Sequence, residues 1–325
     1  MSWDAEIRIA RETAAFACRL AVRVRAALMP SDRADKSDRS PVTVADFGVQ
    51  ALISLDLASA FPNDPIMAEE DAAGLEGGGQ AAGLRSRVVE SVQWLRPDLG
   101  ENRIVQAIGR CGATAGLKGR CWCLDPIDGT KGFIRGGQYA LALSLLVDGR
   151  PVIGVMACPN LPAGDPGQTG RIYTAVLNRG ARVGPLDGRP DTPIKARASD
   201  HPAGVLFCES VESEHVSHKR MDRVRQAFGA SQPPLRMDSQ CKYGLVADGR
   251  AGVYLRVPLE TGHREKPWDH AAGALIVQEA GGRVTDLHGR PLDFSTGQNL
   301  TRNFGIIAAA ASIHDRVLQA FRQTL

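Results

Sequence analysis

The hydrophobic positions of the first thirty residues repeat with the period of an α-helix. One face of this segment carries Ile7, Ala10, Ala14, Ala17, Leu20 or Ala21, Val24 and Leu28. Because positions three and four apart share a face of a helix, the pattern predicts an amphipathic helix over 3–28. Similar patterns predict helices over 45–60 and 84–109, and Pro97 could break the latter because proline lacks the N–H that a helix interior needs.

Short apolar runs predict a set of strands in the first half of the chain. The run 139–147, followed by Asp148-Gly149-Arg150-Pro151, is typical of a β-hairpin because an Asp-Gly pair joins two apolar segments. Segment 160–170 is rich in proline and glycine, which predicts a loop. The strands predicted in this half are 65–68, 120–124, 138–147, 151–158, 171–177 and 181–184.

In the second half, predicted strands and helices alternate, which is typical of α/β proteins. The expected elements are strand 204–208, helix 213–229, helix 239–248, strand 252–256, helix 268–280, strand 304–309 and helix 311–323. Segment 185–193 holds three prolines and a glycine. We therefore place a boundary there, between an N-terminal α+β subdomain over 1–188 and a C-terminal α/β subdomain over 189–325.

Acidic residues form three clusters that lie far apart in the chain: Glu69-Glu70, Asp125-Pro-Ile-Asp128-Gly-Thr130 and Trp268-Asp269. Mg²⁺ takes oxygen ligands, and two such ions can clamp the attacking and leaving oxygens of a phosphoryl transfer. If 121–124 is a strand, Asp125, Asp128 and the carbonyl of Ile127 converge at its end. Each cluster alone has a simpler interpretation: Asp269 could cap, or lie in the first turn of, the helix that follows it.

The strings IMAEED (66–71), LDPIDGTKGF (124–133) and WDHAAG (268–273) together resemble the lithium-sensitive, Mg²⁺-dependent phosphatases typified by inositol monophosphatase. Within that superfamily the chain is most similar to the 3′(2′),5′-bisphosphate nucleotidases. This finer similarity rests on KSDRSPVTVADFGVQ (36–50), DSQCKYGLVADGRAGVYLRVP (238–258), EKPWDHAAG (265–273) and PLDFSTGQ (291–298). The resemblance implies a mixed α/β, five-layer αβαβα sandwich with the active site between its two halves.

The resemblance also implies roles for individual residues. Two or three Mg²⁺ ions would be held by Glu69, Asp125, the Ile127 carbonyl, Asp128 and Asp269. Asp46 and Thr130 would orient and deprotonate the attacking water, and Glu70 would hold a further water beside the metals. The nucleotide would be bound by Thr130, His215, Ser239, Lys242 and Arg256.

The residue types are compatible with these roles, although each has an ordinary alternative. A threonine hydroxyl is a poor base, but it can relay a proton to a carboxylate such as Asp46, which could instead cap its helix. Lys242 and Arg256 suit phosphate groups, but lysine and arginine are also common as solvated surface charges. Ser239 could cap a helix that begins at Gln240 and so direct backbone N–H groups at an anion.

The implied reaction removes the 3′-phosphate of adenosine 3′,5′-bisphosphate and gives AMP; 3′-phosphoadenylyl sulfate could be a second substrate. Such an enzyme would clear a by-product of sulfur metabolism, and we expect inhibition by Li⁺. An inositol mono- or polyphosphate phosphatase would share the metal site and stays an alternative, since only Lys242 and Arg256 favour the nucleotide. A non-catalytic binding protein on the same fold is a further alternative, which the loss of a metal ligand would indicate.

The composition is that of an ordinary globular protein, with 43% hydrophobic and 23% charged residues. A net charge of +3 is too small to indicate a nucleic-acid polymer as partner, and no apolar run approaches the roughly 18 residues of a membrane span. The odd number of cysteines, seven, favours a reducing compartment. We therefore expect a cytoplasmic monomer or homodimer; a transit peptide is disfavoured by Asp4 and Glu6 near the start.

Overall fold

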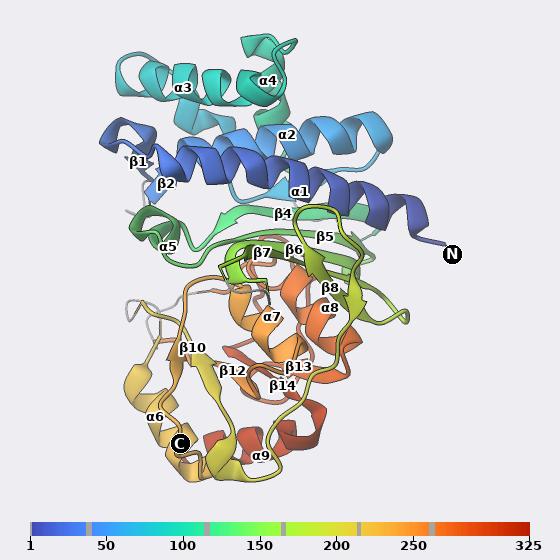
Figure 1. Ribbon diagram of the computed structural model, residues 1–325, viewed down its shortest axis with the longest axis vertical. Coiled ribbons are helices and arrows are strands. Elements are labelled where there is room, and N and C mark those ends of the chain that lie inside the picture. The colour runs from blue at the N-terminus through green and yellow to red at the C-terminus, as the bar shows by residue number, and fades with distance from the viewer. Residues whose placement is uncertain (1, 37–40, 114–117, 164–166, 213–215, 260–263) are drawn as a thin grey trace.

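The computed structural model of the protein describes residues 2–36, 41–113, 118–163, 167–212, 216–259 and 264–325. Two large sheets alternate with three layers of helices (Figure 1). Below α3 (Gln80–Leu95) and α4 (Glu101–Gly109) at the top of Figure 1, the layers are the pair α1 (Asp4–Ala26) and α2 (Val44–Ala60), a seven-stranded sheet, the pair α7 (Cys241–Ala247) and α8 (Ala271–Glu279), a five-stranded sheet, and the pair α6 (His218–Phe228) and α9 (Ala311–Arg322). The expected five-layer αβαβα sandwich is confirmed.

The seven-stranded sheet has its strands in chain order, from β3 to β9. They are β3 (Ile66–Ala68), β4 (Arg120–Asp128), β5 (Ala140–Val147), β6 (Arg150–Pro162), β7 (Thr169–Val176), β8 (Ala181–Pro185) and β9 (Thr192–Pro193). Only β3 and β4 pair in parallel; the other neighbours are antiparallel. The predicted hairpin joins β5 to β6 through Asp148 and Gly149, which have φ of 50° and 72°, the left-handed backbone that such two-residue turns require.

The five-stranded sheet has the mixed order β11-β10-β12-β14-β13. Its strands are β10 (Phe207–Glu209), β11 (Leu235–Arg236), β12 (Val253–Arg256), β13 (Gly282–Thr285) and β14 (Ile306–Ala310). Strand β10 lies parallel to both its neighbours, and β14 is antiparallel to both of its own. A separate two-stranded ribbon, β1 (Arg33–Asp35) and β2 (Pro41–Thr43), lies before α2.

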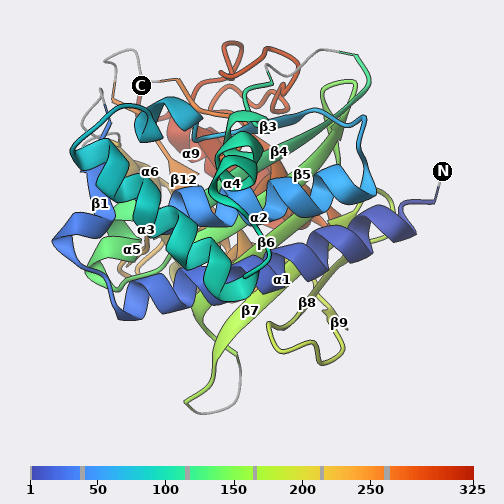
Figure 2. The ribbon, with the colours of Figure 1, turned by 90° about the horizontal axis from the view of Figure 1, so that it is seen from above.

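Helices α3 (Gln80–Leu95) and α4 (Glu101–Gly109) lie outside α2, whereas α1 and α2 run side by side across the sheet (Figures 1 and 2). The sequence pattern allowed one helix over 84–109 with a break at Pro97. The structure has the break, since α3 ends before Arg96 and Pro97 follows. The short helix α5 (Thr130–Arg135) follows β4 directly.

The middle helical layer is buried on every side, which explains its small residues. All seven residues from Ala271 to Val277 of α8 are buried. A Cβ atom added at Gly273 would lie 2.3 Å from the Tyr243 ring, so glycine allows α7 and α8 to approach closely. In the outer layer, the face of α1 predicted from the sequence is indeed the buried one, through Ala10, Ala14, Ala17, Leu20, Ala21 and Val24.

Several expected boundaries were wrong. In the second half, α6, α7 and α8 begin later than expected, at His218, Cys241 and Ala271, because Ser217 caps α6 and turns precede the other two. Strands β1, β2, β9, β11 and β13 were not predicted, and each has only two to four residues. Strand β9 pairs with β8, so the first sheet continues past residue 188; the division at 188/189 stays a prediction.

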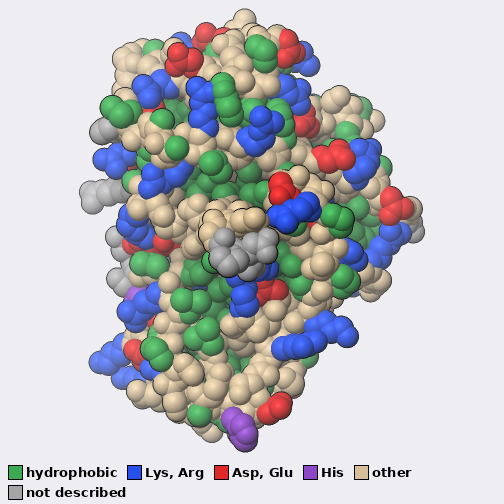
Figure 3. Space-filling view, in the orientation of Figure 1, with side chains coloured by type: hydrophobic (Ala, Val, Ile, Leu, Met, Phe, Trp, Pro, Cys, Tyr) green, Lys and Arg blue, Asp and Glu red, His purple; other side chains and the backbone are tan. Residues whose placement is uncertain are grey.

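The surface agrees with the modest net charge. On the face shown in Figure 3, Lys and Arg side chains lie among acidic, apolar and uncharged ones rather than in one basic patch. No helix in the described part of the chain is both long enough and apolar enough to cross a membrane.

Candidate active site

The end of strand β4 places two carboxylates side by side. Pairing with β5 is continuous from Arg120 to Asp125 and then shifts between Asp125 and Asp128. Pro126 lies in this interval and cannot donate a ladder hydrogen bond. Strand β4 thus extends beyond 124, where we expected it to end. The expected convergence of Asp125 and Asp128 is nevertheless present, because one carboxylate oxygen of each, together with one of Asp269, lies within 4.8 Å of the others.

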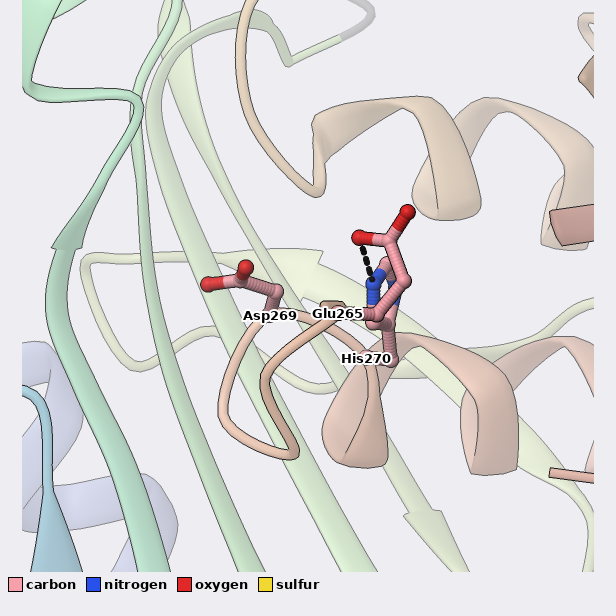
Figure 4. A group of neighbouring side chains, drawn as sticks. All are labelled: Glu265, Asp269 and His270. Carbon is pink, nitrogen blue, oxygen red and sulfur yellow. Dashed lines mark hydrogen bonds and ion pairs between the residues drawn. The ribbon is translucent and has the colours of Figure 1, made fainter. Parts of the chain in front are cut away.

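Asp269 reaches this cluster from the second half of the fold. A turn closed by the Ala271 N–H on the Pro267 carbonyl, at 2.8 Å, comes before the regular part of α8, and His270 is the N-cap. Asp269 is therefore neither the cap nor a first-turn residue, and both of those interpretations were wrong. Its carboxylate turns away from the neighbouring side chains of Glu265 and His270 (Figure 4).

Glu69 and Glu70 follow β3, and the parallel pairing of β3 with β4 brings them to the edge where Asp125 lies. Lys36 donates from Nζ to Glu69 Oε1 at 2.8 Å and to Glu70 Oε1 at 2.6 Å. Burial alone would lower the pKa of Lys36, but the two carboxylates raise it above its usual value. Burial raises the pKa of Glu70 well above its usual range, and Glu69 adds to this. Lys36 thus neutralises part of an acidic pair that would otherwise repel.

Asp46, in the first turn of α2, and Thr130, the first residue of α5, lie next to each other. The helix cap is Thr43, and Asp46 completes the capping box: its Oδ2 accepts from the Thr43 N–H at 2.8 Å and from the Thr43 hydroxyl at 2.6 Å. The Thr130 hydroxyl lies 3.5 Å from Asp46 Oδ1 and 3.1 Å from the Ile127 carbonyl oxygen, and its single hydrogen can be donated to either one. Burial raises the pKa of Asp46 to about 7. Asp46 is therefore the third residue of the helix and not its N-cap, so that interpretation was wrong; its role in catalysis stays a prediction.

The carboxylate cluster fits a metal centre. Asp125 is 1% exposed, and its Oδ1 has no hydrogen-bond partner within the described residues. Burial, reinforced by Glu69 and Asp128, raises the pKa of Asp125 well above its usual range, and burial with Asp128 nearby does the same for Asp269. A cation between these oxygens would supply a partner for Asp125 Oδ1 and would offset the repulsion among the carboxylates. The donors are all oxygens, which Mg²⁺ prefers.

Ser239 and Gln240 bring the start of α7 against this cluster. The Gln240 N–H donates to Asp128 Oδ2. Ser239 has a φ of 68°, and a Cβ at Gly129, whose φ is 83°, would lie 2.9 Å from the Ser239 Cβ. Helix α7 begins at Cys241 with Gln240 as N-cap, so the expected cap at Ser239 was wrong. The Ser239 hydroxyl still accepts from the Cys241 N–H at 3.2 Å.

Lys242 is buried rather than solvated, with 2% of its surface exposed. Its Nζ donates to the carbonyls of Met237 at 2.8 Å and Ser239 at 2.6 Å, and it lies 5.2 Å from the centre of the Tyr254 ring. Burial lowers the pKa of Lys242 to about 8, although Asp128 opposes the shift. A buried ammonium that lines a cavity is a strong candidate partner for an anion.

Arg256 is also held inside the protein. Its Nε donates to Glu265 Oε1 at 2.8 Å, and Glu265 Oε2 lies 3.1 Å from His270 Nε2, the contact drawn in Figure 4. Burial opposes ionisation of Arg256, but Glu265 raises the pKa of the guanidinium above its usual value.

These residues share a cavity of about 260 Å³ between the two halves. Its lining comprises Glu69, Asp125, Asp128, Gly129, Thr130, Lys131, Ser210, Glu212, Val216, Asp238, Ser239, Gln240, Lys242, Tyr254, Arg256, Asp269 and His270. Glu70 lies instead in a neighbouring cavity, which Glu69 also lines. Asp46 and Ile127 reach the site through their contacts with Thr130. His215 lies outside the described residues.

Three residues at the site received no role from the sequence. Lys36 and Glu265 belong to the segments 36–50 and 265–273, on which the resemblance rests. A charged residue within such a segment could have been taken as a candidate site residue. Gln240 contributes through its backbone N–H to Asp128 and through a side-chain bond of 2.8 Å to the Trp268 carbonyl. From the sequence, backbone N–H groups here were expected to face a bound anion, and Asp128 was not identified as an acceptor.

Comparison with known proteins gives a consistent result. The model of the Inositol monophosphatase family matches residues 3–325. A 3′(2′),5′-bisphosphate nucleotidase of Emericella nidulans is 40% identical over 316 residues, covering 89% of this chain and 90% of that protein. The 3′(2′),5′-bisphosphate nucleotidase of Schizosaccharomyces pombe is 39% identical over 340 residues, covering 98% and 96%.

Solved structures resemble the fold at lower identity. The extragenic suppressor protein suhB of Bartonella henselae aligns with a TM-score of 0.69 at 22% identity, covering 99% of this chain and 100% of that one. An inositol monophosphatase of Anabaena aligns with a TM-score of 0.63 at 22% identity, covering 99% and 97%. At this identity the likeness supports the fold alone.

Proposed function

Because the chain belongs to the inositol monophosphatase family, we propose that it is a Mg²⁺-dependent phosphatase that removes the 3′-phosphate of adenosine 3′,5′-bisphosphate. One observation carries the choice of substrate: the cavity that holds the carboxylates Asp125, Asp128 and Asp269 also holds two cations, the buried Lys242 and the Arg256 side chain, which is 15% exposed. A substrate with two phosphates can engage both groups at once. The names of the relatives, 3′(2′),5′-bisphosphate nucleotidases, agree with this choice.

The residues that would hold the metals are Glu69, Asp125, the Ile127 carbonyl, Asp128 and Asp269. Bound Mg²⁺ ions, two or three in number, would supply charge stabilisation for the phosphoryl oxygens and a lowered pKa for water. Lys36 contacts Glu69 at Oε1 and Glu70 at Oε1, so it would compete with a metal for that oxygen of Glu69. Glu70, whose Oε1 accepts from Lys36, would hold a water next to the cluster.

Thr130 and Asp46 would handle the proton of the attacking water. With its hydroxyl hydrogen directed at Asp46 Oδ1, Thr130 exposes a lone pair that accepts a hydrogen from the water and orients it. The proton then passes through Thr130 to Asp46, whose Oδ2 is already fixed by Thr43. Ser239, Lys242, Arg256 and His215 would bind the nucleotide, with the two cations on its second phosphate.

The test is phosphate release with Mg²⁺ from adenosine 3′,5′-bisphosphate, inositol 1-phosphate and inositol 1,4-bisphosphate in parallel. We expect a large preference for adenosine 3′,5′-bisphosphate over both inositol phosphates, and inhibition by Li⁺. 3′-Phosphoadenylyl sulfate, assayed beside them, should be hydrolysed no faster than adenosine 3′,5′-bisphosphate. Preference for an inositol phosphate would overturn the substrate and leave the metal site intact. The variant Asp128→Asn should lose turnover while keeping its fold, and retained turnover would contradict the metal assignment. If the protein were a binding protein without catalysis, neither the wild type nor the variant would show turnover.

A further inference from the structure

Glu265 is a charged residue buried inside the protein, with 2% of its surface exposed. Each of its two carboxylate oxygens has a different partner. Oε1 accepts from Arg256 Nε at 2.8 Å, and Oε2 accepts from His270 Nε2 at 3.1 Å. Removing a carboxylate from water is costly, so a buried glutamate needs a structural or functional reason. Both of its partners, Arg256 and His270, line the cavity, which suggests that the reason lies there.

The contacts fix the tautomer of His270. A carboxylate oxygen can only accept, so Nε2 carries the hydrogen, and the other ring nitrogen, Nδ1, accepts from the Tyr243 hydroxyl at 2.9 Å. Tyr243 lies fully buried in α7. A chain of hydrogen bonds therefore runs from the middle helical layer through His270 and Glu265 to Arg256. It anchors the guanidinium to the rigid interior of the fold.

The same contacts argue against a metal at Glu265. Its oxygens, the Asp269 carboxylate and a His270 nitrogen lie close enough to hold an ion. However, both Glu265 oxygens are already engaged, and Asp269 points away from the pair in Figure 4, while its oxygens lie within 4.8 Å of those of Asp125 and Asp128. Glu265 is thus occupied by Arg256 and His270, and Asp269 by the carboxylate cluster.

We propose that Glu265 is a positioning residue that fixes the orientation of the Arg256 guanidinium and thereby sets the preference for a doubly phosphorylated nucleotide. The inference rests on the proposed function. A guanidinium binds phosphate through a planar fork, so its strength depends on the direction in which the fork points. With Nε held by Glu265, the plane of the fork is fixed before substrate arrives, and less conformational entropy is lost on binding.

The experiment compares adenosine 3′,5′-bisphosphate with adenosine 3′-monophosphate, which lacks the second phosphate. In the Glu265→Gln variant we expect kcat/KM for the bisphosphate to fall about tenfold or more, mainly through KM, because one charge-assisted contact is weakened. The monophosphate should change little. The matched control is Glu209→Gln: Glu209 is 3% exposed and accepts from Arg236 Nε at the same 2.8 Å, yet it is not part of the cavity lining. It should leave the ratio of the two substrates unchanged.

A double variant separates an action through Arg256 from a direct one. If Glu265 acts through Arg256, adding Glu265→Gln to Arg256→Gln changes neither substrate further. Additive losses, equal losses on both substrates, or a weakened Mg²⁺ affinity measured by calorimetry would each overturn the proposal.

A second readout does not depend on turnover. The Nε–H proton of Arg256, followed by ¹⁵N-edited NMR, should exchange slowly with water in the wild-type protein and much faster in Glu265→Gln. An unchanged exchange rate would contradict the proposal that Glu265 positions Arg256. A wild-type protein that hydrolyses neither nucleotide would refute the proposed function, and this exchange rate alone would then decide whether Glu265 orients Arg256.

Discussion

The Thr130 hydroxyl lies 3.5 Å from Oδ1 of Asp46, a residue 84 positions earlier in the chain. The other oxygen of Asp46 completes the cap of α2. One carboxylate thus serves the helix with one oxygen and the site with the other. These two functions can be separated by substitution, because asparagine keeps an acceptor for the cap but cannot take up a proton.

We therefore expect Asp46→Asn to fold with nearly wild-type stability and to lose about 10²–10⁴-fold in kcat, the usual contribution of a positioned base. KM should change little. Thr130→Ser, which keeps the hydroxyl, should retain most of the activity, and Thr130→Ala should not. Steady-state kinetics and thermal unfolding check both points. A full loss in Thr130→Ser, or an active Asp46→Asn, would argue against the proton relay.

Removal of divalent metal should destabilise the protein as well as inactivate it. A ligand that binds only the folded state stabilises it by about 2.7 kcal/mol at one hundred times its Kd. We expect Mg²⁺ to raise the melting temperature of the wild type and not that of Asp125→Asn. Without Mg²⁺, Asp125→Asn should melt higher than the wild type, because it relieves repulsion among buried carboxylates. The exposed Asp187→Asn is the control and should behave as wild type.

Gly129→Ala should disturb the contact between the metal-ligand strand and the start of α7. Position 129 has a φ of 83°, and its Cβ would lie 2.9 Å from that of Ser239. We expect a loss of about 1–3 kcal/mol in the free energy of unfolding, together with a raised KM. The control Gly78→Ala has nothing within 4 Å of the added atom. Urea denaturation measures the stability of both variants, and steady-state kinetics measures KM. Equal stability of the two variants would contradict the close contact between Gly129 and Ser239.

Lys242→Met should weaken nucleotide binding more than it weakens the fold. It removes a charge from the cavity and leaves the carbonyls of Met237 and Ser239 without this donor. We expect KM for adenosine 3′,5′-bisphosphate to rise about tenfold or more, in line with the loss of a charged hydrogen bond. Lys118→Met, on the exposed surface, should leave KM unchanged. An unaltered KM in Lys242→Met would remove this residue from the substrate site.

The stability of the C-terminal sheet should depend on pH through His314. This side chain is fully buried and bonded at Nε2 to the Thr285 hydroxyl at 3.0 Å. Burial, helped by Arg283 and opposed by Asp315, lowers the pKa of His314 below its ordinary value of 6.5. The unfolded chain therefore binds the proton more readily, and stability is lost as the pH falls below that value.

Substituting His314 should flatten this dependence. The free energy of unfolding, measured in urea at a pH above and a pH below the ordinary histidine value, should differ less in His314→Gln than in the wild type. Equal pH dependence in both proteins would show that His314 does not titrate with unfolding.

The local part of the site could be predicted from the sequence. Asp125 and Asp128 are close in the chain, and a strand followed by a turn places both side chains at the same end of the strand. The convergence of Glu69 and Asp269 on them followed from a resemblance, since nothing in the spacing of three distant segments fixes how they meet. In the fold, the long helical pattern of α1 and the hairpin after Val147 were strong signals, whereas the two-residue strands β9 and β11 carry no usable pattern.

The rest depends on contacts between distant segments, which no local pattern encodes. Ser239 has a left-handed backbone and packs closely against Gly129, 110 positions earlier in the chain. Glu265 looks like a surface charge in the sequence and is buried because Arg256 and His270 both reach it. Lys242 was expected either on a phosphate or in solvent; its two carbonyl acceptors were not foreseen.

Neither sheet carries a complete site. Asp125 and Asp128 belong to the seven-stranded sheet, whereas Asp269, Lys242 and Arg256 belong to the elements around the five-stranded one. Catalysis therefore requires both sheets to be in place, and a chain in which only one of them has formed would be inert. For the same reason, recovered activity during refolding would report the assembly of the whole sandwich rather than the formation of either sheet.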